Sequence, residues 1–312
     1  MNKWWGLFWF LGIVWGSSFL FIRIGVQEMD QYQVVFTRTA IAAIGLNITL
    51  ALRGKHLPLD WNSLRPLIII GLGNVVVPFL LITWGEKSVE SGLASVLQST
   101  AALFSVLLAH FAFHDERFTL QKIVGVIVGF VGVVVLASRS WASGQVVTSD
   151  LLGQLAIVVA SLFYAIFTIY GKRMLRSQVE PLMIAAGSIT TGAVVSGILM
   201  IAAPLWGGKG PVAYTDLSSD ALIAVGLLGF LNTFLAYLVY YPLVQHLGVA
   251  KTSMVTYVVP VVGLVLGAIF LEEVVDARLL FGAALIFAGI GVVNVRLSRR
   301  SEMLAADVPE AG

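Results

Sequence analysis

The chain has 312 residues, of which 58% are hydrophobic and 12% charged, and it contains no cysteine. A soluble domain carries about 25% charged residues, so this composition excludes a protein whose whole surface meets water. The lack of cysteine excludes disulfides and thiolate metal sites. We therefore expect lipid to solvate the outside of the molecule.

Charged residues fall in short clusters separated by apolar runs of roughly 18 to 23 residues, the length that crosses about 30 Å of hydrocarbon as a helix. Transmembrane strands would alternate apolar and polar residues, and runs such as LASVLQSTAALFSVLLAHFAF do not. The predicted fold class is all-α, a polytopic membrane protein with ten transmembrane helices. In chain order the predicted spans are 5–24, 33–52, 66–85, 92–113, 121–138, 152–171, 182–203, 219–241, 250–271 and 278–296.

The positive charges predict the orientation of these spans. With ten spans, both termini share one side of the membrane. If that side is cytoplasmic, thirteen of the nineteen Lys and Arg face the cytoplasm, five face outside, and Arg38 lies within the second span. Because short cytoplasmic loops are enriched in positive charge, we predict a multi-pass protein of the cell (plasma or inner) membrane with both termini cytoplasmic. The polar tail, 298–312, is expected to be disordered.

The two halves of the chain resemble each other. WGSSFLFIR from Trp15 matches YAIFTIYGK from Tyr164, and GLGNVVVPF from Gly71 resembles GLLGFLNTF from Gly226. When 92–135 is laid on 249–292 without a gap, five pairs coincide: Phe113 with Phe270, Glu116 with Glu273, Thr119 with Asp276, Gly125 with Gly282, and Gly132 with Gly289. We infer two five-helix repeats, at 1–144 and 145–297.

An odd number of spans in each repeat makes the second repeat begin on the opposite side of the membrane. The halves are then inverted and related by a pseudo-two-fold axis in the membrane plane, an architecture common in alternating-access transporters. The matching acidic turns, DERFT and EEVVD, each end on an expected N-cap, Thr119 or Asp276. For Glu116 and Glu273 we expect a place near the N-terminus of the next helix, with proton handling or gating as the alternative.

The sequence resembles the ten-helix EamA-type members of the drug/metabolite transporter superfamily. The resemblance is carried by WGSSFLFIR, by FTRTAIAA, by the two acidic turns and by the glycine-rich spans after them, and it covers about residues 5 to 297. It implies an exporter or permease of amino acids, other metabolites or drugs, with a central cavity lined by spans 1, 3, 4, 6, 8 and 9. The proline often found in the fourth span of the family is Leu103 here, whereas Pro260 is present in the ninth.

Polar and aromatic side chains within the spans are the candidate site, because a polar group in a lipid-spanning helix tends to face a neighbour or a water-filled cavity. Serine and threonine can instead bond carbonyls of their own helix, and Tyr or Trp at a span end can anchor the interface. The predicted substrate-binding residues are Trp15, Ser18, Asn74, Ser95, Gln98, Tyr164, Thr168, Asn232, Tyr237, Tyr241, Thr256 and Tyr257.

Structural or gating roles are predicted for a second set of residues. Arg38, the only strong base well inside a span, is interpreted as mainly structural; it could also snorkel outward, pair with a helix end or attract an anionic group. The prolines mark either hinges or packed kinks. This set consists of Arg38, Pro78, Glu116, Thr119, Pro260, Glu273 and Asp276.

The acidic residues limit the mechanism. None of the seventeen falls at mid-membrane. The small four-helix multidrug relatives couple drug to proton through a carboxylate in the first helix, and the first span here has none. We therefore expect a cavity suited to neutral or zwitterionic solutes, with facilitated diffusion supported at least as well as proton antiport.

The predicted function is a membrane transporter that exports amino acids or related solutes by alternating access. A broad-specificity drug or cation efflux transporter is the alternative in the same class. An intramembrane enzyme is disfavoured, because the chain has no HExxH motif, no pair of membrane aspartates and no serine–histidine or serine–lysine dyad at a suitable depth. A non-transporting membrane sensor is the third alternative. We expect a small-molecule substrate and the bilayer as partners, no nucleic acid, no cofactor, no metal and a monomeric chain.

Overall fold

The computed structural model describes residues 3–112, 119–141, 149–176 and 179–294, and its regular secondary structure there is entirely helical. Each predicted span appears as one helix or as two or three consecutive ones. In chain order the elements are α1 (Lys3–Glu28), α2 (Gln31–Leu52), α3 (Trp61–Gly71), η1 (Leu72–Val76), α4 (Val77–Gly85), α5 (Ser91–Gln98), α6 (Thr100–Ala112), α7 (Leu120–Trp141), α8 (Ser149–Arg176), α9 (Pro181–Ala202), η2 (Ala203–Trp206), η3 (Tyr214–Asp216), α10 (Ser219–Gly229), η4 (Phe230–Leu235), α11 (Ala236–Leu247), α12 (Val249–Ser253), α13 (Val255–Phe270) and α14 (Ala277–Asn294).

The outward faces of these helices suit lipid. Nine stretches of the described chain are long and apolar enough to cross a membrane, and the tenth, Ala277–Val293, is apolar but shorter. Large apolar side chains such as Ile44 on α2 and Ile201 on α9 are more than 60% exposed. Extended apolar surface of this kind is rare on soluble monomers. The predicted all-α, polytopic membrane fold is confirmed.

Helix starts follow the capping preferences of the sequence. Asp30, Asp60 and Ser218 precede α2, α3 and α10, and each side chain accepts a hydrogen bond from a backbone amide two or three residues further on, at 3.0 to 3.2 Å. The two expected N-caps behave in the same way. Thr119 accepts from an amide of α7 at 3.3 Å, and Asp276 accepts from one of α14 at 2.7 Å. These side chains satisfy amides that a helix leaves free at its first turn.

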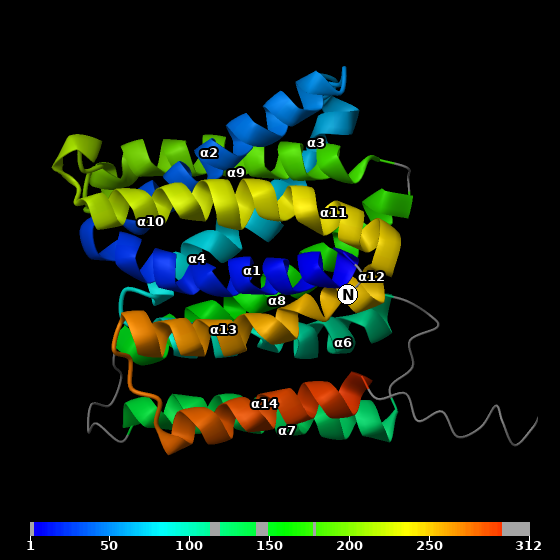
Figure 1. Cartoon of the computed structure of the whole chain (residues 1–312), viewed down its shortest axis with the longest axis vertical. Helices are drawn as coiled ribbons and strands as arrows, with labels where there is room; N and C mark the ends of the chain where they lie inside the picture. Colours follow the sequence, from blue (N-terminus) through cyan, green and yellow to red (C-terminus); the bar gives the residue numbers. More distant parts are fainter. Residues whose placement is uncertain (1–2, 113–118, 142–148, 177–178, 295–312) are drawn as a thin grey trace, which may run out of the picture.

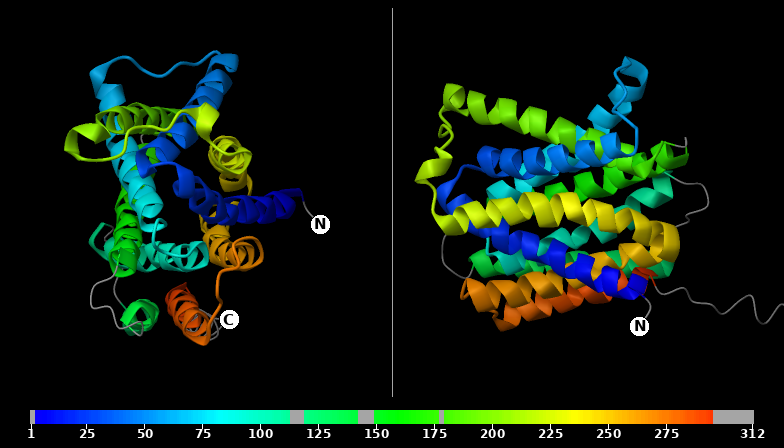
Figure 2. Two further views of the ribbon diagram at one scale, coloured as in Figure 1. Left: turned by 90° about the vertical axis from the view of Figure 1, so that its left-hand side faces the viewer. Right: turned by 45° about the horizontal axis from the view of Figure 1, so that its top comes forward.

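The packing of the helices obeys the expected inversion. Equivalent helices of the two repeats pack against each other: α2 against α9, α5 against α13, and α7 against α14. The other large contacts come in pairs that interchange when the repeats are exchanged, namely α1–α13 with α6–α8, and α1–α10 with α4–α8. Figure 1 shows the α7–α14 pair at one end of the long axis and α2 with α9 toward the other, and the left view of Figure 2 shows the same order.

Glycines allow a close contact between the repeats along α7 and α14. A Cβ at Gly125 would lie 2.7 Å from the Gly289 carbonyl oxygen, and a Cβ at Gly132 would lie 2.6 Å from the Gly282 carbonyl oxygen. The register of the sequence repeat makes Gly125 equivalent to Gly282 and Gly132 to Gly289. Exchanging the repeats therefore turns one contact into the other, as a two-fold axis requires. Small residues let transmembrane helices approach this closely.

Four spans are interrupted, again in equivalent pairs. Spans 3 and 8 each contain a π-helical segment, η1 and η4. Span 4 breaks at Ser99 and span 9 at Met254. Span 4 is interrupted although Leu103 replaces the family's proline, and the Ser99 and Thr100 hydroxyls at the break donate to carbonyls of the preceding turn at 2.6 Å. Pro260 lies inside α13, beyond the break in its own span.

Adding one methyl group at Gly289 should destabilise the α7–α14 pair. A Cβ there would overlap the Gly125 carbonyl and the backbone of Gly129, so we expect Gly289→Ala to lower the free energy of unfolding by about 1–3 kcal/mol. The measurement is the thermal midpoint of the purified protein in detergent. Gly291→Ala is the matched control, because nothing lies within 4 Å of a Cβ at that position of the same helix. Equal midpoints for the two variants would contradict the close approach.

Candidate functional site

A buried arginine lies where the two repeats meet. Arg38, on α2, is only 7% exposed. Its Nε donates to Thr233 Oγ1 of η4 at 2.8 Å, and its guanidinium stands 3.8 Å from the ring centre of Phe79 on α4. The Thr233 hydroxyl donates in turn to the Leu228 carbonyl at 2.9 Å, which orients its lone pairs toward Arg38. Hydrogen bond and ring together fix the plane of the guanidinium.

The charge of Arg38 is not balanced by a contacting acid. Within the part of the chain that the structure describes, Arg38 makes this one hydrogen bond and no ion pair. The phenol groups of Tyr164 and Tyr237 lie within electrostatic range, and so does the Glu86 carboxylate, beyond ion-pair distance. Both tyrosines are half-buried and pack against the apolar cluster that contains Phe79. The site therefore combines one cation with two phenols on apolar walls.

The predicted asparagines occupy the two π-helical segments. Asn74 lies in η1 and Asn232 in η4, at similar places in the two repeats. Each has an enclosed side-chain oxygen without a hydrogen-bond partner among the described residues. Pro78 follows at the start of α4, where a missing amide is tolerated. π-helical segments shift the side chains that follow them and are frequent at functional sites.

The amide nitrogen of Asn232 joins η4 to α1. Nδ2 donates to the Val14 carbonyl, to Ser17 Oγ at 2.9 Å and to Ser18 Oγ at 3.1 Å. Asn232 is 1% exposed, and both serines are buried. This part of the candidate site is thus a contact between the first and the eighth span, with its carbonyl oxygen left over as an acceptor.

The polar residues of span 4 face two neighbouring helices. Ser95 is buried against Gly263 of α13, and its hydroxyl lies 2.7 Å from the Gly92 carbonyl and 3.4 Å from that of Pro260. Gln98 ends α5, and its backbone carbonyl accepts from Ser161 Oγ of α8 at 3.2 Å. Ser95 therefore contacts the ninth span, while Gln98 lies beside the sixth.

The remaining predicted residues differ in exposure. Trp15 on α1 and Tyr257 on α13 are half-buried and pack against the core. Thr168 on α8 and Thr256 on α13 are exposed. The Thr256 hydroxyl donates to the Ser253 carbonyl, three residues earlier, at 2.8 Å. Tyr241 lies outside the residues whose side chains the structure describes.

Glu273 binds a helix that the sequence did not indicate. We expected the next helix, α14, but Asp276 caps that one. The Glu273 carboxylate accepts instead from the α5 backbone amides of Ser91, at 2.6 Å, and Gly92, at 2.8 Å, and from the Ser91 hydroxyl at 3.0 Å. The negative charge sits at the positive end of the α5 dipole. Its repeat counterpart, Glu116, lies outside the described residues.

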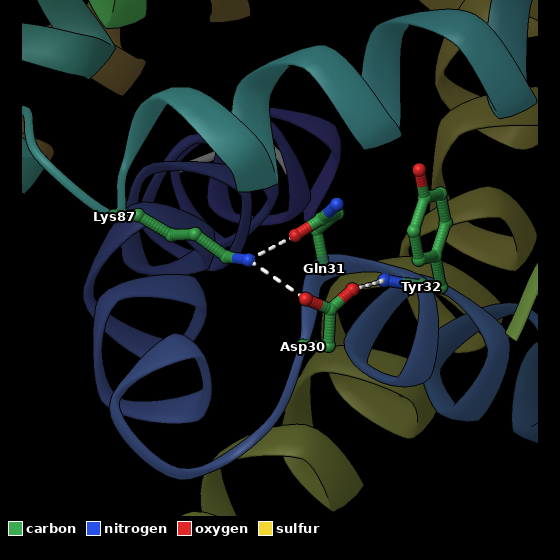
Figure 3. A network of polar contacts seen from close by, with 4 residues as sticks. All are labelled: Asp30, Gln31, Tyr32 and Lys87. Atoms are coloured by element: carbon green, nitrogen blue, oxygen red, sulfur yellow. Dashed lines mark hydrogen bonds and ion pairs between the residues drawn. The ribbon is translucent and has the colours of Figure 1, made fainter. Parts of the chain in front are cut away.

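A second polar network joins the ends of three helices (Figure 3). The Lys87 ammonium, after α4, forms an ion pair with Asp30 at 2.9 Å and also contacts the Gln31 side chain. Asp30 simultaneously caps α2 through the amide of Tyr32. Exposed ion pairs of this kind contribute little individually. Here the pair links the α1–α2 turn to the end of α4.

Glu86, directly after α4, is a buried acid that the sequence analysis did not single out. It is 0% exposed, and neither carboxylate oxygen has a hydrogen-bond partner among the described residues. Arg23 of α1 reaches the Glu86 backbone carbonyl. Burial raises the pKa of Glu86 well above its ordinary value; the Glu273 charge raises it further, whereas Arg23 and Arg38 lower it.

Two five-helix repeats with buried polar groups at their junction are an architecture common among membrane transporters. A model of the EamA-like transporter family matches residues 4–138 and 151–295. Since these ranges cover most of the chain, the protein belongs to that family. The resemblance drawn from the sequence motifs is confirmed.

Individual relatives have transporter names. The chain is 30% identical over 262 residues, covering 82% of this chain and 79% of the relative, to an "uncharacterized inner membrane transporter YedA" of Escherichia coli K12. It is 29% identical over 291 residues, 93% of each chain, to a "probable terminal-alkyne amino-acid exporter" of Streptantibioticus cattleyicolor. A crystal structure of a chain 20% identical superposes with a TM-score of 0.64 over 92% of this chain and 95% of the other, which shows the shared fold.

Three residues of this region were missed by sequence reasoning. Thr233 and Phe79 hold Arg38, and each is the direct neighbour of a residue that was predicted, Asn232 or Pro78. Glu86 stands at the end of a long apolar run, where an acid is normally solvated. The polarity of Thr233 within a span, and the position of Phe79 next to Pro78, could have suggested these two residues. No local signal indicates that Glu86 is enclosed.

The Glu273 contact should stabilise the fold more than an exposed acid does. Glu273→Gln keeps the shape of the side chain but removes the charge that two amides and a hydroxyl bind, so we expect the free energy of unfolding to fall by about 1–2 kcal/mol. Thermal midpoints in detergent measure this. Glu272→Gln is the matched control, since the neighbouring side chain is exposed. The proposed contact would be refuted if both variants melted with the wild type.

Proposed function

We propose that this protein exports amino acids or related neutral or zwitterionic solutes across the cell membrane by alternating access. The observation that carries the proposal is the pair of enclosed carboxamide oxygens of Asn74 and Asn232, on similar π-helical segments. A buried acceptor without a donor costs about 1–3 kcal/mol. A solute ammonium supplies the missing donor, and a zwitterion brings a balancing charge with it.

Two further observations support this class of solute. The relative in Streptantibioticus cattleyicolor is named for amino-acid export, which agrees in both solute and direction. Arg38 is a buried cation without a contacting acid among the described residues, and a second cation beside it would be repelled in a low dielectric. Amino acids are therefore favoured over cationic drugs. The transporter names of the relatives also favour transport over catalysis.

Transport would follow from the exchange of conformations between the repeats. Because both repeats belong to one chain, a monomer suffices for alternating access. Glu86 is the one fully buried acid of the described chain, and it lies at the end of α4 rather than within a span. This placement favours facilitated diffusion down the solute gradient, with obligatory proton coupling as the competing mechanism.

Efflux from proteoliposomes tests the proposal. Vesicles containing the purified protein and loaded singly with radiolabelled L-amino acids should release at least one of them faster than protein-free vesicles. Asn74→Leu should slow this release about five- to tenfold, because the solute loses an acceptor. Asn62→Leu, at an exposed asparagine of α3, should not.

Release of cationic drugs but of no amino acid would favour the drug-efflux alternative. Uphill accumulation driven by a pH gradient alone, and abolished by Glu86→Gln, would replace facilitated diffusion with proton coupling.

The proposed orientation can be tested with single cysteines, because the native chain has none. We expect Lys209→Cys, after α9, to react with a membrane-impermeant maleimide in intact spheroplasts. Asn62→Cys, at the start of α3, should react only after permeabilisation. Both positions are exposed. The reverse pattern would place the termini outside.

A further inference from the structure

The charge of Arg38 needs an anion that the described protein does not bring into contact with it. Its side chain is 7% exposed, lies within a transmembrane helix and has no ion pair among the described residues. Holding an unpaired cation at this depth is costly, and such residues mark solute pathways. Glu86, an acid whose charge is felt at Arg38, lies beyond ion-pair distance. A bound solute can supply the missing negative charge.

The described contacts of Arg38 engage one nitrogen and one flat face of its guanidinium. Nε is occupied by Thr233 Oγ1 at 2.8 Å, and the flat face lies on the Phe79 ring at 3.8 Å. The two terminal nitrogens make no hydrogen bond within the described chain. They form the fork that pairs with both oxygens of a carboxylate. The group is thus held in position before any ligand arrives.

The groups near Arg38 come from both repeats. Arg38 belongs to the first repeat, whereas Tyr164 on α8 and Tyr237 on α11 belong to the second, and both phenols lie within electrostatic range of the guanidinium. An anion held here would contact both repeats and would therefore respond to their relative movement.

We propose that Arg38 binds the carboxylate of the transported solute, beside the apolar cluster against which Tyr164 and Tyr237 pack. This inference rests on the proposed function and narrows it, because it restricts the substrates to solutes that carry a carboxylate. The enclosed oxygens of Asn74 and Asn232 are the corresponding acceptors for the ammonium group. From the sequence alone, Arg38 is interpreted as mainly structural. We now assign it a role in binding because it forms no ion pair within the described chain.

A purely structural Arg38 would tie α2 to η4 and nothing more. Removing it would then lower stability without changing which ligands bind. The ratio of affinities for a carboxylate and for its carboxamide separates the two roles, because loss of stability alone does not alter that ratio.

The experiment measures binding to the purified full-length protein by ligand-induced thermal stabilisation. The probes are the twenty standard L-amino acids, tested singly, and the L-amino acid amide of each one that binds. We expect the wild type to bind the acid at least about tenfold more tightly than the amide, the effect of losing one charge-assisted hydrogen-bonded pair.

Variants at Arg38 assign this preference to the residue. Arg38→Gln should bind acid and amide alike. Arg38→Lys should weaken binding of the acid about tenfold while keeping a preference for it, because an ammonium retains the charge without the fork. Arg65→Gln, which removes an exposed arginine of α3, should retain the wild-type preference. If Arg38→Gln does not fold, the acid-to-amide affinity ratio of the wild type and of Arg38→Lys still tests whether Arg38 binds the carboxylate.

Two results would overturn the inference, and they differ from failure of the proposed function. Amino acids that bind and are transported without preference over their amides would refute the Arg38 site and leave amino-acid export standing. The same holds if Arg38→Gln keeps the wild-type preference. Absence of both binding and flux for every amino acid would refute the proposed function, and this inference with it.

Discussion

A polar group in hydrocarbon cannot turn to water for a hydrogen bond, and the architecture of this protein depends on that constraint. Serine and threonine hydroxyls within the spans satisfy it locally, as Ser99 and Thr100 do where span 4 breaks. Three of the exceptions among the described residues, the oxygens of Asn74 and Asn232 and the charge of Arg38, belong to helices that meet between the repeats. Another, the Glu86 carboxylate, lies at the end of α4.

The same junction is where the repeats hold each other. Arg38 reaches Thr233, Asn232 reaches Ser18, and Glu273 caps α5, so each contact joins one repeat to the other. A movement of one repeat against the other must alter these contacts. The glycine contacts of α7 with α14 lie apart from them, at one end of the molecule (Figure 1). In these contacts the helix backbones approach each other directly, without polar side chains between them.

Much of the fold could be predicted because lipid simplifies the problem. The length of the apolar runs identified the spans. A gapless alignment of 92–135 with 249–292, offset by 157 residues, paired Gly125 with Gly282 and Gly132 with Gly289, and the structure places these glycines in symmetric contacts. The candidate site was predicted less completely. Composition identified Asn232 and Arg38 as unusual, but their partners lie far away in the chain, as with Arg38 and Thr233, which are 195 residues apart. No local pattern encodes such a pairing.

By itself, the sequence determined that this chain crosses a membrane as ten helices in two related halves, because a lipid-solvated backbone leaves the helix as the only solution compatible with these apolar runs. Only the tertiary structure decided which polar side chains meet. The hydropathy of a span does not determine which face of its helix points toward the protein interior. Close packing against helices distant in the chain determines that face. That packing turned Glu273 toward α5, enclosed Glu86 and set Arg38 on Phe79 without an acid in contact.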